Sequence, residues 1–155
     1  MIIFLYGQDT YRTRQKIKEI IEHYKKIHKS GLNLIFFEGE DLDFRDFKNT
    51  LDSASMFKEK KLVILKDIFS NQNFKEEFLA QKEKSLNRDN IILIYEKKEI
   101  SENNLLFQFL KKSSKSQEFK LLEGEKLKNW AKKEFENYGA KIEEKALEKL
   151  IEFVG

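Results

Sequence analysis

The chain has 155 residues, 40% hydrophobic and 37% charged, which is enough for one well-formed core with room for a small second domain. It has no cysteine, which excludes disulfides, thiolate metal sites and a cysteine nucleophile. The 30 Lys and Arg against 27 Asp and Glu leave a net charge of only +3, which argues against a dedicated electrostatic DNA-binding protein. No apolar run reaches the roughly 18 residues of a membrane span, and the first residues lack the features of a signal peptide, so we expect a soluble, cytoplasmic protein.

Short runs rich in apolar, β-branched and aromatic residues predict the strands of a sheet. Four of them are near-continuous instead of alternating, as is typical of strands buried on both faces of a parallel sheet. The predicted strands cover residues 2–6, 34–37, 62–65, 91–95 and 119–122. The polar segments 82–90 and 111–117 are interpreted as loops.

Between the predicted strands lie segments with helical periodicity. Residues 13–29 carry one apolar stripe at the spacing of an amphipathic helix. Shorter stripes of the same kind lie within residues 44–54, 74–79 and 106–110. This alternation of strands and helices predicts an α/β fold, in which a parallel sheet of about five strands forms a three-layer domain with right-handed crossovers.

The pattern changes after Glu123-Gly124. Two helical stripes follow one another at residues 127–138 and 142–154, separated by Gly139 and without a strand between them. We therefore predict an α/β domain at residues 1–123 and, at residues 124–155, the first helices of a small helical domain. Because the last stripe has the pattern of an unfinished helix, we expect the chain to be the N-terminal part of a longer protein.

The turn after the first predicted strand is where an α/β protein can hold a phosphate group. A phosphate-binding loop needs the pattern G-x-x-x-x-G-K-[ST], whose glycines and lysine hold the phosphates. After Gly7 no second glycine, lysine or hydroxyl falls in this register. We interpret Gly7 as the residue of a tight turn and Asp9 or Thr10 as the N-cap of the next helix.

The ends of the third and fourth predicted strands lack the residues of a nucleotide hydrolase. Such an enzyme usually carries an acidic pair after the third strand, to hold Mg²⁺ and to activate water. Here a lysine takes the first of these two places, and a lysine opposes a metal ion. The fourth strand ends in Tyr95-Glu96, with no Asn or Thr to sense a γ-phosphate. We predict a degenerate nucleotide site without cofactor or metal, formed by Gly7, Asp9, Lys66 and Asp67.

The densest carboxylate cluster lies at residues 38–43, between the second predicted strand and the next helix. One interpretation is a turn in which Asp43 caps that helix and Asp46 enriches its first turn. The alternative is a divalent-cation site or an acid–base pair.

Met56 and Phe57 follow the apolar stripe of the second predicted helix, just before a cationic run and a buried strand. One interpretation is that the pair packs under the sheet as part of the core. The alternative is an exposed apolar wedge that anchors a partner protein, because an aromatic and a flexible side chain can together fill a partner's pocket. Ala54 and Ser55 are small residues that would allow close approach beside such a wedge.

Three motifs, in this order along the chain, carry a family resemblance. Residues 3–9 end in Tyr-Gly-Gln-Asp, Ser55-Met56-Phe57 lies four residues before the strand at 61–65, and Trp130 with residues 139–142 and 153–155 marks the final helices. Together they resemble the opening motif, the Ser-Leu-Phe clamp-binding element and the start of the helical lid domain of the bacterial clamp-loader delta subunits of DNA polymerase III. Met56 stands where leucine is usual, which conserves volume. The resemblance covers the whole chain.

The resemblance implies a degenerate AAA+ module, a non-catalytic subunit that neither binds nor hydrolyses ATP. Ala54, Ser55, Met56 and Phe57 would form its clamp-binding element, which grips the sliding clamp (beta subunit) and favours the clamp's open interface during DNA replication. Its further partners would be the other clamp-loader subunits, gamma/tau and delta-prime, with DNA bound only within the assembled complex and no membrane association. Because the family's pentamer is held by a helical collar that this chain lacks, we expect the chain alone to be monomeric.

Three other functions fit parts of the sequence. A P-loop ATPase with an unusual phosphate loop conflicts with the missing Lys and Ser/Thr after Gly7. A delta-prime subunit has the same fold, but the cysteine-rich zinc module of that family is incompatible with a chain that has no cysteine. A nucleic-acid-binding domain conflicts with the near-neutral net charge. Its candidate contacts would be Lys58, Lys60, Lys61, Lys111, Lys112 and Lys115.

Overall fold

The structure, a computed structural model, describes residues 1–55, 59–82 and 89–154. The chain forms two compact units, Met1–Phe119 and Lys120–Gly155. The predicted domain boundary after residue 123 falls within the second unit, just before its first helix. Among the residues described, no helix is long and apolar enough to cross a membrane.

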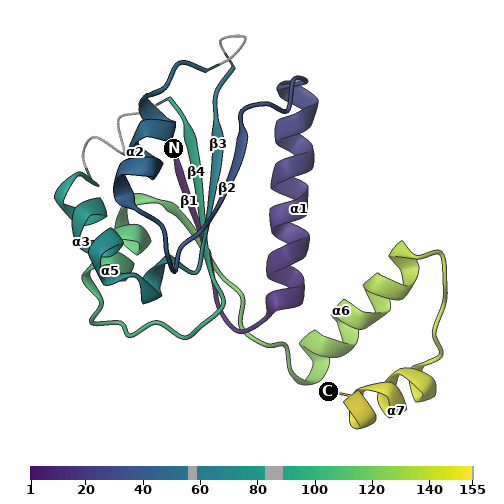
Figure 1. Ribbon diagram of the computed structural model, residues 1–155. Helices are drawn as coiled ribbons and strands as arrows, with labels where there is room; N and C mark the ends of the chain where they lie inside the picture. The colour runs from purple at the N-terminus through teal and green to yellow at the C-terminus, as the bar shows by residue number, and fades with distance from the viewer. Residues whose placement is uncertain (56–58, 83–88, 155) are drawn as a thin grey trace. The chain divides into compact units, whose positions relative to one another are not determined.

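The first unit is built on a parallel sheet of five strands (Figure 1). The strands lie in the order β2-β3-β4-β1-β5, so that β3, β4 and β1 are central. The central strands are mostly buried, as their near-continuous apolar composition predicts. The predicted α/β fold with about five parallel strands is confirmed. The strands are β1 (Ile2–Tyr6), β2 (Leu34–Glu38), β3 (Leu62–Lys66), β4 (Ile91–Glu96) and β5 (Lys115–Glu118).

The predicted position of the fifth strand is wrong. We expected it at residues 119–122, but β5 covers Lys115–Glu118, part of a segment interpreted as a loop. β5 is an edge strand that pairs only with β1, and all four of its side chains are exposed. A strand that buries no side chain needs no apolar residues, so its sequence carries no strand signal. The apolar Phe119, just beyond it, is buried in the core instead.

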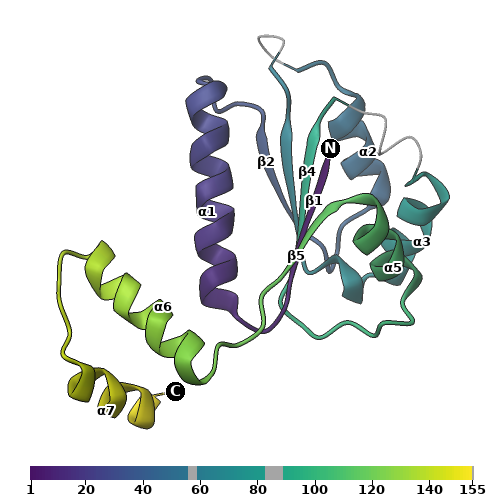
Figure 2. The ribbon, with the colours of Figure 1, turned by 180° about the vertical axis from the view of Figure 1, so that it is seen from behind.

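The helices of the first unit cover the two faces of the sheet unequally (Figures 1 and 2). α1 (Thr10–Ile27) lies on one face, where Ile17 and Tyr24 pack against the sheet. α2 (Phe44–Asp52), α3 (Gln72–Ala80) and α5 (Leu105–Ser113) lie on the other, and the short 3₁₀ helix η2 (Ile68–Ser70) precedes α3. The result is the three-layer arrangement expected from the sequence.

Side chains of Asp and Asn begin α1, α2, α3 and α5. Asp9 caps α1, Asp43 caps α2, Asn71 caps α3 and Asn104 caps α5, each by accepting a hydrogen bond from a main-chain N–H of the first turn. The face under α2, α3 and α5 is filled by aromatic rings in edge-on and tilted contacts. These rings are Phe4, Phe44, Phe47, Phe74, Phe78 and Phe107.

The second unit is a pair of helices, α6 (Gly124–Asn137) and α7 (Glu144–Val154). Ala131 of α6 and Leu147 of α7 are buried, and Lys128 and Glu148 form an ion pair of 2.8 Å between the helices. Gly139 has a φ of +74°, the left-handed conformation that often follows a helix end. The two predicted helices therefore exist, with Gly139 between them.

Candidate functional site

The carboxyl ends of β1, β3 and β4 meet at one edge of the sheet, where open α/β sheets usually bind their ligands. Gly7 and Asp9 follow β1, while Lys66 and Asp67 lie at the end of β3. Glu96, the last residue of β4, accepts a hydrogen bond at its carbonyl from the Gly7 N–H at 3.3 Å. The fold therefore brings all four residues of the predicted degenerate site to one edge.

The turn between β1 and α1 is closed by the chain's own backbone. The Phe119 N–H donates to the Tyr6 carbonyl at 2.7 Å, and the Phe119 carbonyl accepts from the Asp9 N–H at 3.0 Å. Gly7 has a φ of +123°, and a Cβ there would collide with the Phe119 carbonyl. Gly7 is therefore required both by its conformation and by the close approach of residue 119.

Asp9 occupies the position at the N-terminus of α1 that a phosphate would take. Its Oδ1 accepts a hydrogen bond from the Arg12 N–H at 2.9 Å, and its Oδ2 pairs with Arg12 Nε at 2.7 Å. Helix N-termini bind anions through free N–H groups and the helix dipole. Here the dipole faces a carboxylate of the chain itself, so the sequence prediction that Asp9 or Thr10 caps the helix is confirmed for Asp9.

Lys66 and Asp67 are held by ion pairs, one with β2 and one with the residue that follows β4. Lys66 Nζ lies 2.8 Å from Glu38 of β2, and this hydrogen bond raises the pKa of Lys66. Asp67 has a φ of +53°, and its Oδ2 lies 3.3 Å from Lys97 Nζ. Among the residues described, no group of three or more His, Cys, Asp or Glu side chains could hold a metal ion.

Glu96 is an acidic residue of this edge that is fully buried, with 1% of its surface exposed. Its carboxyl oxygens accept hydrogen bonds from the N–H groups of Phe69 and Lys98, both at 3.2 Å. Burial is the main cause that raises the pKa of Glu96, and the neighbouring Asp67 carboxyl raises it further. The burial of Glu96 was not predicted, because a glutamate beside two lysines carries no sequence signal of burial.

The predicted clamp-binding element lies in the connection between α2 and β3. Its first two residues are described: Ala54 is exposed and Ser55 is half-buried. Met56 and Phe57 lie outside the described residues. Thus the structure gives the surroundings of the element, which are set by Ser53 on one side and by Glu59 and Lys61 on the other.

Lys61 is buried, with 3% of its surface exposed, and it caps the C-terminus of α2. Its ammonium donates to the carbonyls of Thr50 and Ser53 and, at 2.7 Å, to Ser53 Oγ. A cation at this end of a helix is favoured by the helix dipole. Lys61 is one of the lysines predicted as possible nucleic-acid contacts, and its burial makes that prediction wrong for this residue.

Glu59 ties the same connection to the loop between α1 and β2. Its carboxylate accepts hydrogen bonds from Ser30 Oγ and, at 3.5 Å, from the Ser30 N–H. The bond from Ser30 is the main cause that lowers the pKa of Glu59. Tyr24 of α1 adds a third tie by donating from its hydroxyl to the Lys60 carbonyl at 2.6 Å. The residues on both sides of the predicted element are therefore anchored to the body of the first unit.

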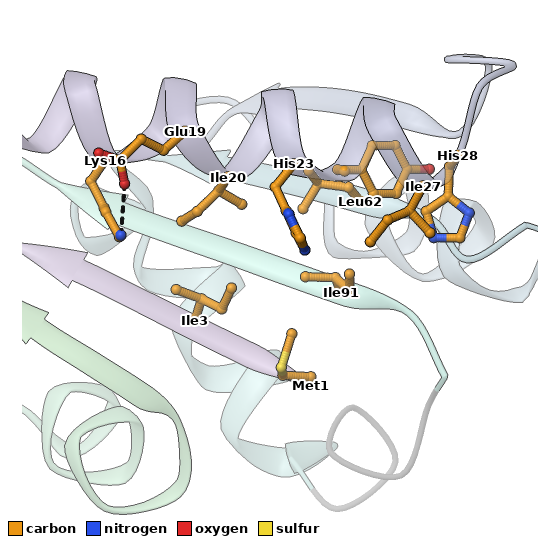
Figure 3. A pocket seen from close by; sticks show the side chains of 11 residues that line it. Met1, Ile3, Lys16, Glu19, Ile20, His23, Ile27, His28, Leu62 and Ile91 are labelled. Atoms are coloured by element: carbon orange, nitrogen blue, oxygen red, sulfur yellow. Dashed lines mark hydrogen bonds and ion pairs between the residues drawn. The ribbon is translucent and has the colours of Figure 1, made fainter.

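A groove of about 490 Å³ lies between α1 and the sheet, near the amino end of β1 (Figure 3). Its floor is formed by Ile3 and Ile91, and Ile20 and Ile27 of α1 line its wall. The Lys16–Glu19 ion pair of 2.8 Å lies at its edge. Because the lining is mostly apolar, the groove offers packing contacts rather than groups for chemistry.

The sequence of residues 4–120 matches a protein family described as DNA polymerase III, delta subunit. The chain belongs to this family. Among solved structures, the DNA clamp loader delta protein YqeN of Bacillus subtilis is similar in fold to this delta-family chain. The similarity covers 97% of this chain and 47% of YqeN, with a TM-score of 0.65 and 20% identity.

A DNA polymerase III gamma subunit-related protein of Thermotoga maritima is also similar to the delta-family chain. The similarity covers 88% of this chain and 47% of that protein, with a TM-score of 0.57 and 18% identity. The delta-family chain thus spans about half the length of both solved structures. Among curated proteins, no sequence matches it.

Proposed function

We propose that this delta-family chain is the clamp-contacting part of a clamp-loader delta subunit. It binds the sliding clamp through the connection between α2 and β3, with Met56 and Phe57 as the anchor and Ala54 and Ser55 beside them. Binding favours the open interface of the clamp during DNA replication. The observation that carries this proposal is the family match over residues 4–120, which spans the whole connection.

The anchored surroundings of the connection support its role as a binding element. A loop that binds a partner loses less conformational entropy when its ends are already fixed. Lys61 fixes the end at α2 through three hydrogen bonds, and Glu59 fixes the other end against Ser30. Ala54 is exposed beside the expected anchor, which leaves room for a partner to approach.

The subunit neither binds nor hydrolyses ATP in this proposal. The position for a phosphate at the N-terminus of α1 is taken by the Asp9 carboxylate, and the Asp9 N–H is taken by the Phe119 carbonyl. ATP binding would have to displace both groups. The chain therefore acts as a non-catalytic subunit.

The remaining partners follow from the family and are part of the same proposal. The full-length subunit assembles with gamma/tau and delta-prime subunits, and DNA is bound only in that complex. The protein is cytoplasmic, and this chain alone is monomeric.

The test is the affinity of the chain for the bacterial sliding clamp, measured by calorimetry or surface plasmon resonance. Replacing Met56 and Phe57 together by alanine should weaken binding by about 2–4 kcal/mol, because paired anchors commonly contribute 1–2 kcal/mol or more each. The matched control replaces Phe36 of β2 and Leu105 of α5, two apolar side chains that are 60% and 69% exposed away from the connection and its anchors. That control should bind the clamp as the unmodified chain does.

The same double variant separates the two interpretations of Met56 and Phe57. If they anchor the clamp, its melting temperature stays near that of the unmodified chain while clamp binding falls. If they are core residues, the loss appears as several kcal/mol of unfolding free energy. Clamp affinity equal to that of the unmodified chain would refute the proposed element and leave the function resting on family membership.

A further inference from the structure

The groove between α1 and the sheet is an apolar surface that has no role in the proposed function. α1 buries Ile17 and Tyr24 against the sheet, but Ile27 in its last turn is 61% exposed. The side chains of Ile20 and Ile27 point from α1 toward the sheet and line the groove with Ile91 (Figure 3). Its volume of about 490 Å³ lies within the range of about 300–1,000 Å³ that is typical of ligand pockets. The groove therefore has room for apolar side chains of a partner.

One end of the groove is formed by residues that close the connection between α2 and β3. Leu62, the first residue of β3, lines the groove together with Tyr24. The Tyr24 hydroxyl donates to the Lys60 carbonyl at 2.6 Å, and the Ile91 N–H donates to the Lys61 carbonyl at 2.8 Å. The groove is therefore continuous with the end of the connection that carries the proposed clamp-binding element. A partner bound to that connection comes within reach of the groove.

The charges of α1 are balanced along its middle but not at its end. Lys16 pairs with Glu19 at 2.8 Å, and Lys18 pairs with Glu22 at 3.9 Å. Lys26, in the last turn, follows Glu19 by about two helical turns and so lies on the same side of α1, the side that borders the groove. Lys26 is exposed, and no carboxylate of the residues described forms an ion pair with it. The groove therefore carries an unbalanced positive charge at this end.

The acidic residues next to Lys60 are engaged by other groups. Glu59 accepts hydrogen bonds from Ser30, and Asp89 lies 4.0 Å from Lys60 Nζ. A partner's carboxylate can therefore meet Lys26 without displacing an acidic residue of the chain. An apolar surface beside such a cation fits a partner segment in which an apolar side chain stands next to Asp or Glu.

We propose that the groove is a second contact for the sliding clamp, an inference that rests on the proposed function. An apolar side chain of the clamp fills the groove against Ile20 and Ile27, and a neighbouring carboxylate of the clamp pairs with Lys26. The clamp is favoured over other occupants because the connection that it binds contributes residues 60–62 to the wall of the groove. Two contacts fix the orientation of the clamp on the chain as well as its position.

The first test is the affinity of Ile27→Ser for the bacterial sliding clamp. Because Ile27 is mostly exposed, its melting temperature should change by less than about 3 °C. Clamp affinity should fall about tenfold, a common loss when one apolar anchor is removed. The matched control is Leu105→Ser on α5, which removes an exposed apolar side chain away from the groove. The control should bind the clamp as the unmodified chain does.

The second test is charge reversal by Lys26→Glu, with Lys112→Glu as the matched control. Both lysines are exposed in the last turn of a helix, so reversal at either position costs its helix a similar amount. Lys26→Glu should weaken clamp binding several-fold at about 50 mM salt and much less at about 1 M, because salt screens an exposed ion pair. Lys112→Glu should bind as the unmodified chain does at both salt concentrations.

The outcomes separate this inference from the proposed function. If replacing Met56 and Phe57 abolishes binding while Ile27→Ser and Lys26→Glu bind normally, the second contact is refuted and the proposed function stands. Binding that depends on Ile27 but not on Met56 and Phe57 refutes the proposed element and supports the groove contact. A chain that does not bind the clamp overturns both. Self-association in light scattering that Ile27→Ser abolishes would also contradict the inference, because a second copy of the chain would then cover the groove.

Discussion

Replacing Lys61 by methionine removes a buried ammonium while keeping an unbranched side chain of similar length. Three oxygens lose the hydrogen bond that Lys61 donates: the carbonyls of Thr50 and Ser53, and Ser53 Oγ. The Thr50 carbonyl keeps a hydrogen bond from Ser53 Oγ at 3.0 Å, whereas the Ser53 carbonyl loses its donor among the residues described. The three lost bonds to a charged group together cost about 2 kcal/mol or more. Loss of a cation at the C-terminus of α2 adds about 0.5 kcal/mol.

Two effects act in the opposite direction. The ammonium no longer has to be desolvated on folding, and methionine buries its own apolar surface. Because Ser53 is exposed, water can also replace part of the lost bonding. We therefore expect Lys61→Met to lower the free energy of unfolding by about 2–3 kcal/mol. This is close to the smallest total cost of the lost hydrogen bonds and the lost cation. At this chain length that is about 5–10 °C in melting temperature.

The measurement is urea denaturation of Lys61→Met beside Lys60→Met as the matched control. The Lys60 side chain is 56% exposed and reaches Asp89 only at 4.0 Å, so its replacement should change stability by less than about 0.5 kcal/mol. If Lys61→Met is no more destabilising than Lys60→Met, the buried cap of α2 is refuted. At a temperature at which Lys61→Met is folded, its clamp affinity should be lower than that of the unmodified chain. The reason is that the connection between α2 and β3 is then no longer fixed to the end of α2.

Three further predictions concern the turn after β1. Asp9→Ala should cost about 1–2 kcal/mol in urea denaturation, because it removes the N-cap of α1 and its pair with Arg12. Gly7→Ala should cost more than about 2 kcal/mol by the same measurement, since it adds strain at positive φ to a collision with the Phe119 carbonyl. Calorimetry with MgATP should give no saturable heat, and binding tighter than about 100 μM, or about −5.5 kcal/mol, would refute the degenerate site.

The central fold was predictable because its signals are local. β3 and β4 are apolar over nearly their whole length, and their burial on both faces follows from that composition. Asp9 and Asp43 stand directly before apolar helical stripes, and both cap helices as expected. The position of β5 was not predictable, because this strand is defined by its main-chain pairing with β1. Four exposed polar residues satisfy that pairing.

The buried charges were not predictable, because burial depends on partners that a sequence pattern does not reveal. Lys61 was grouped with surface lysines, yet its acceptors are the last carbonyls of α2, which become available only where that helix ends. Glu96 depends on Phe69, 27 positions earlier in the chain, for one of its hydrogen bonds. The clamp-binding prediction for Met56 and Phe57 lies outside the described residues and stays a prediction.

The turn after β1 offers two separate reasons to expect no phosphate binding. The absence of a lysine after Gly7 leaves open that another arrangement of the turn holds a phosphate. A filled helix terminus is a stronger reason, because a phosphate must displace the Asp9 carboxylate from the first turn of α1 and the Phe119 carbonyl from the Asp9 N–H. The displaced cap alone costs about 1–2 kcal/mol, and the carboxylate then repels the incoming anion at close range. Asp9→Ala removes the carboxylate but does not supply the missing lysine. Because the lysine is also needed to hold a phosphate, this variant should bind no MgATP either.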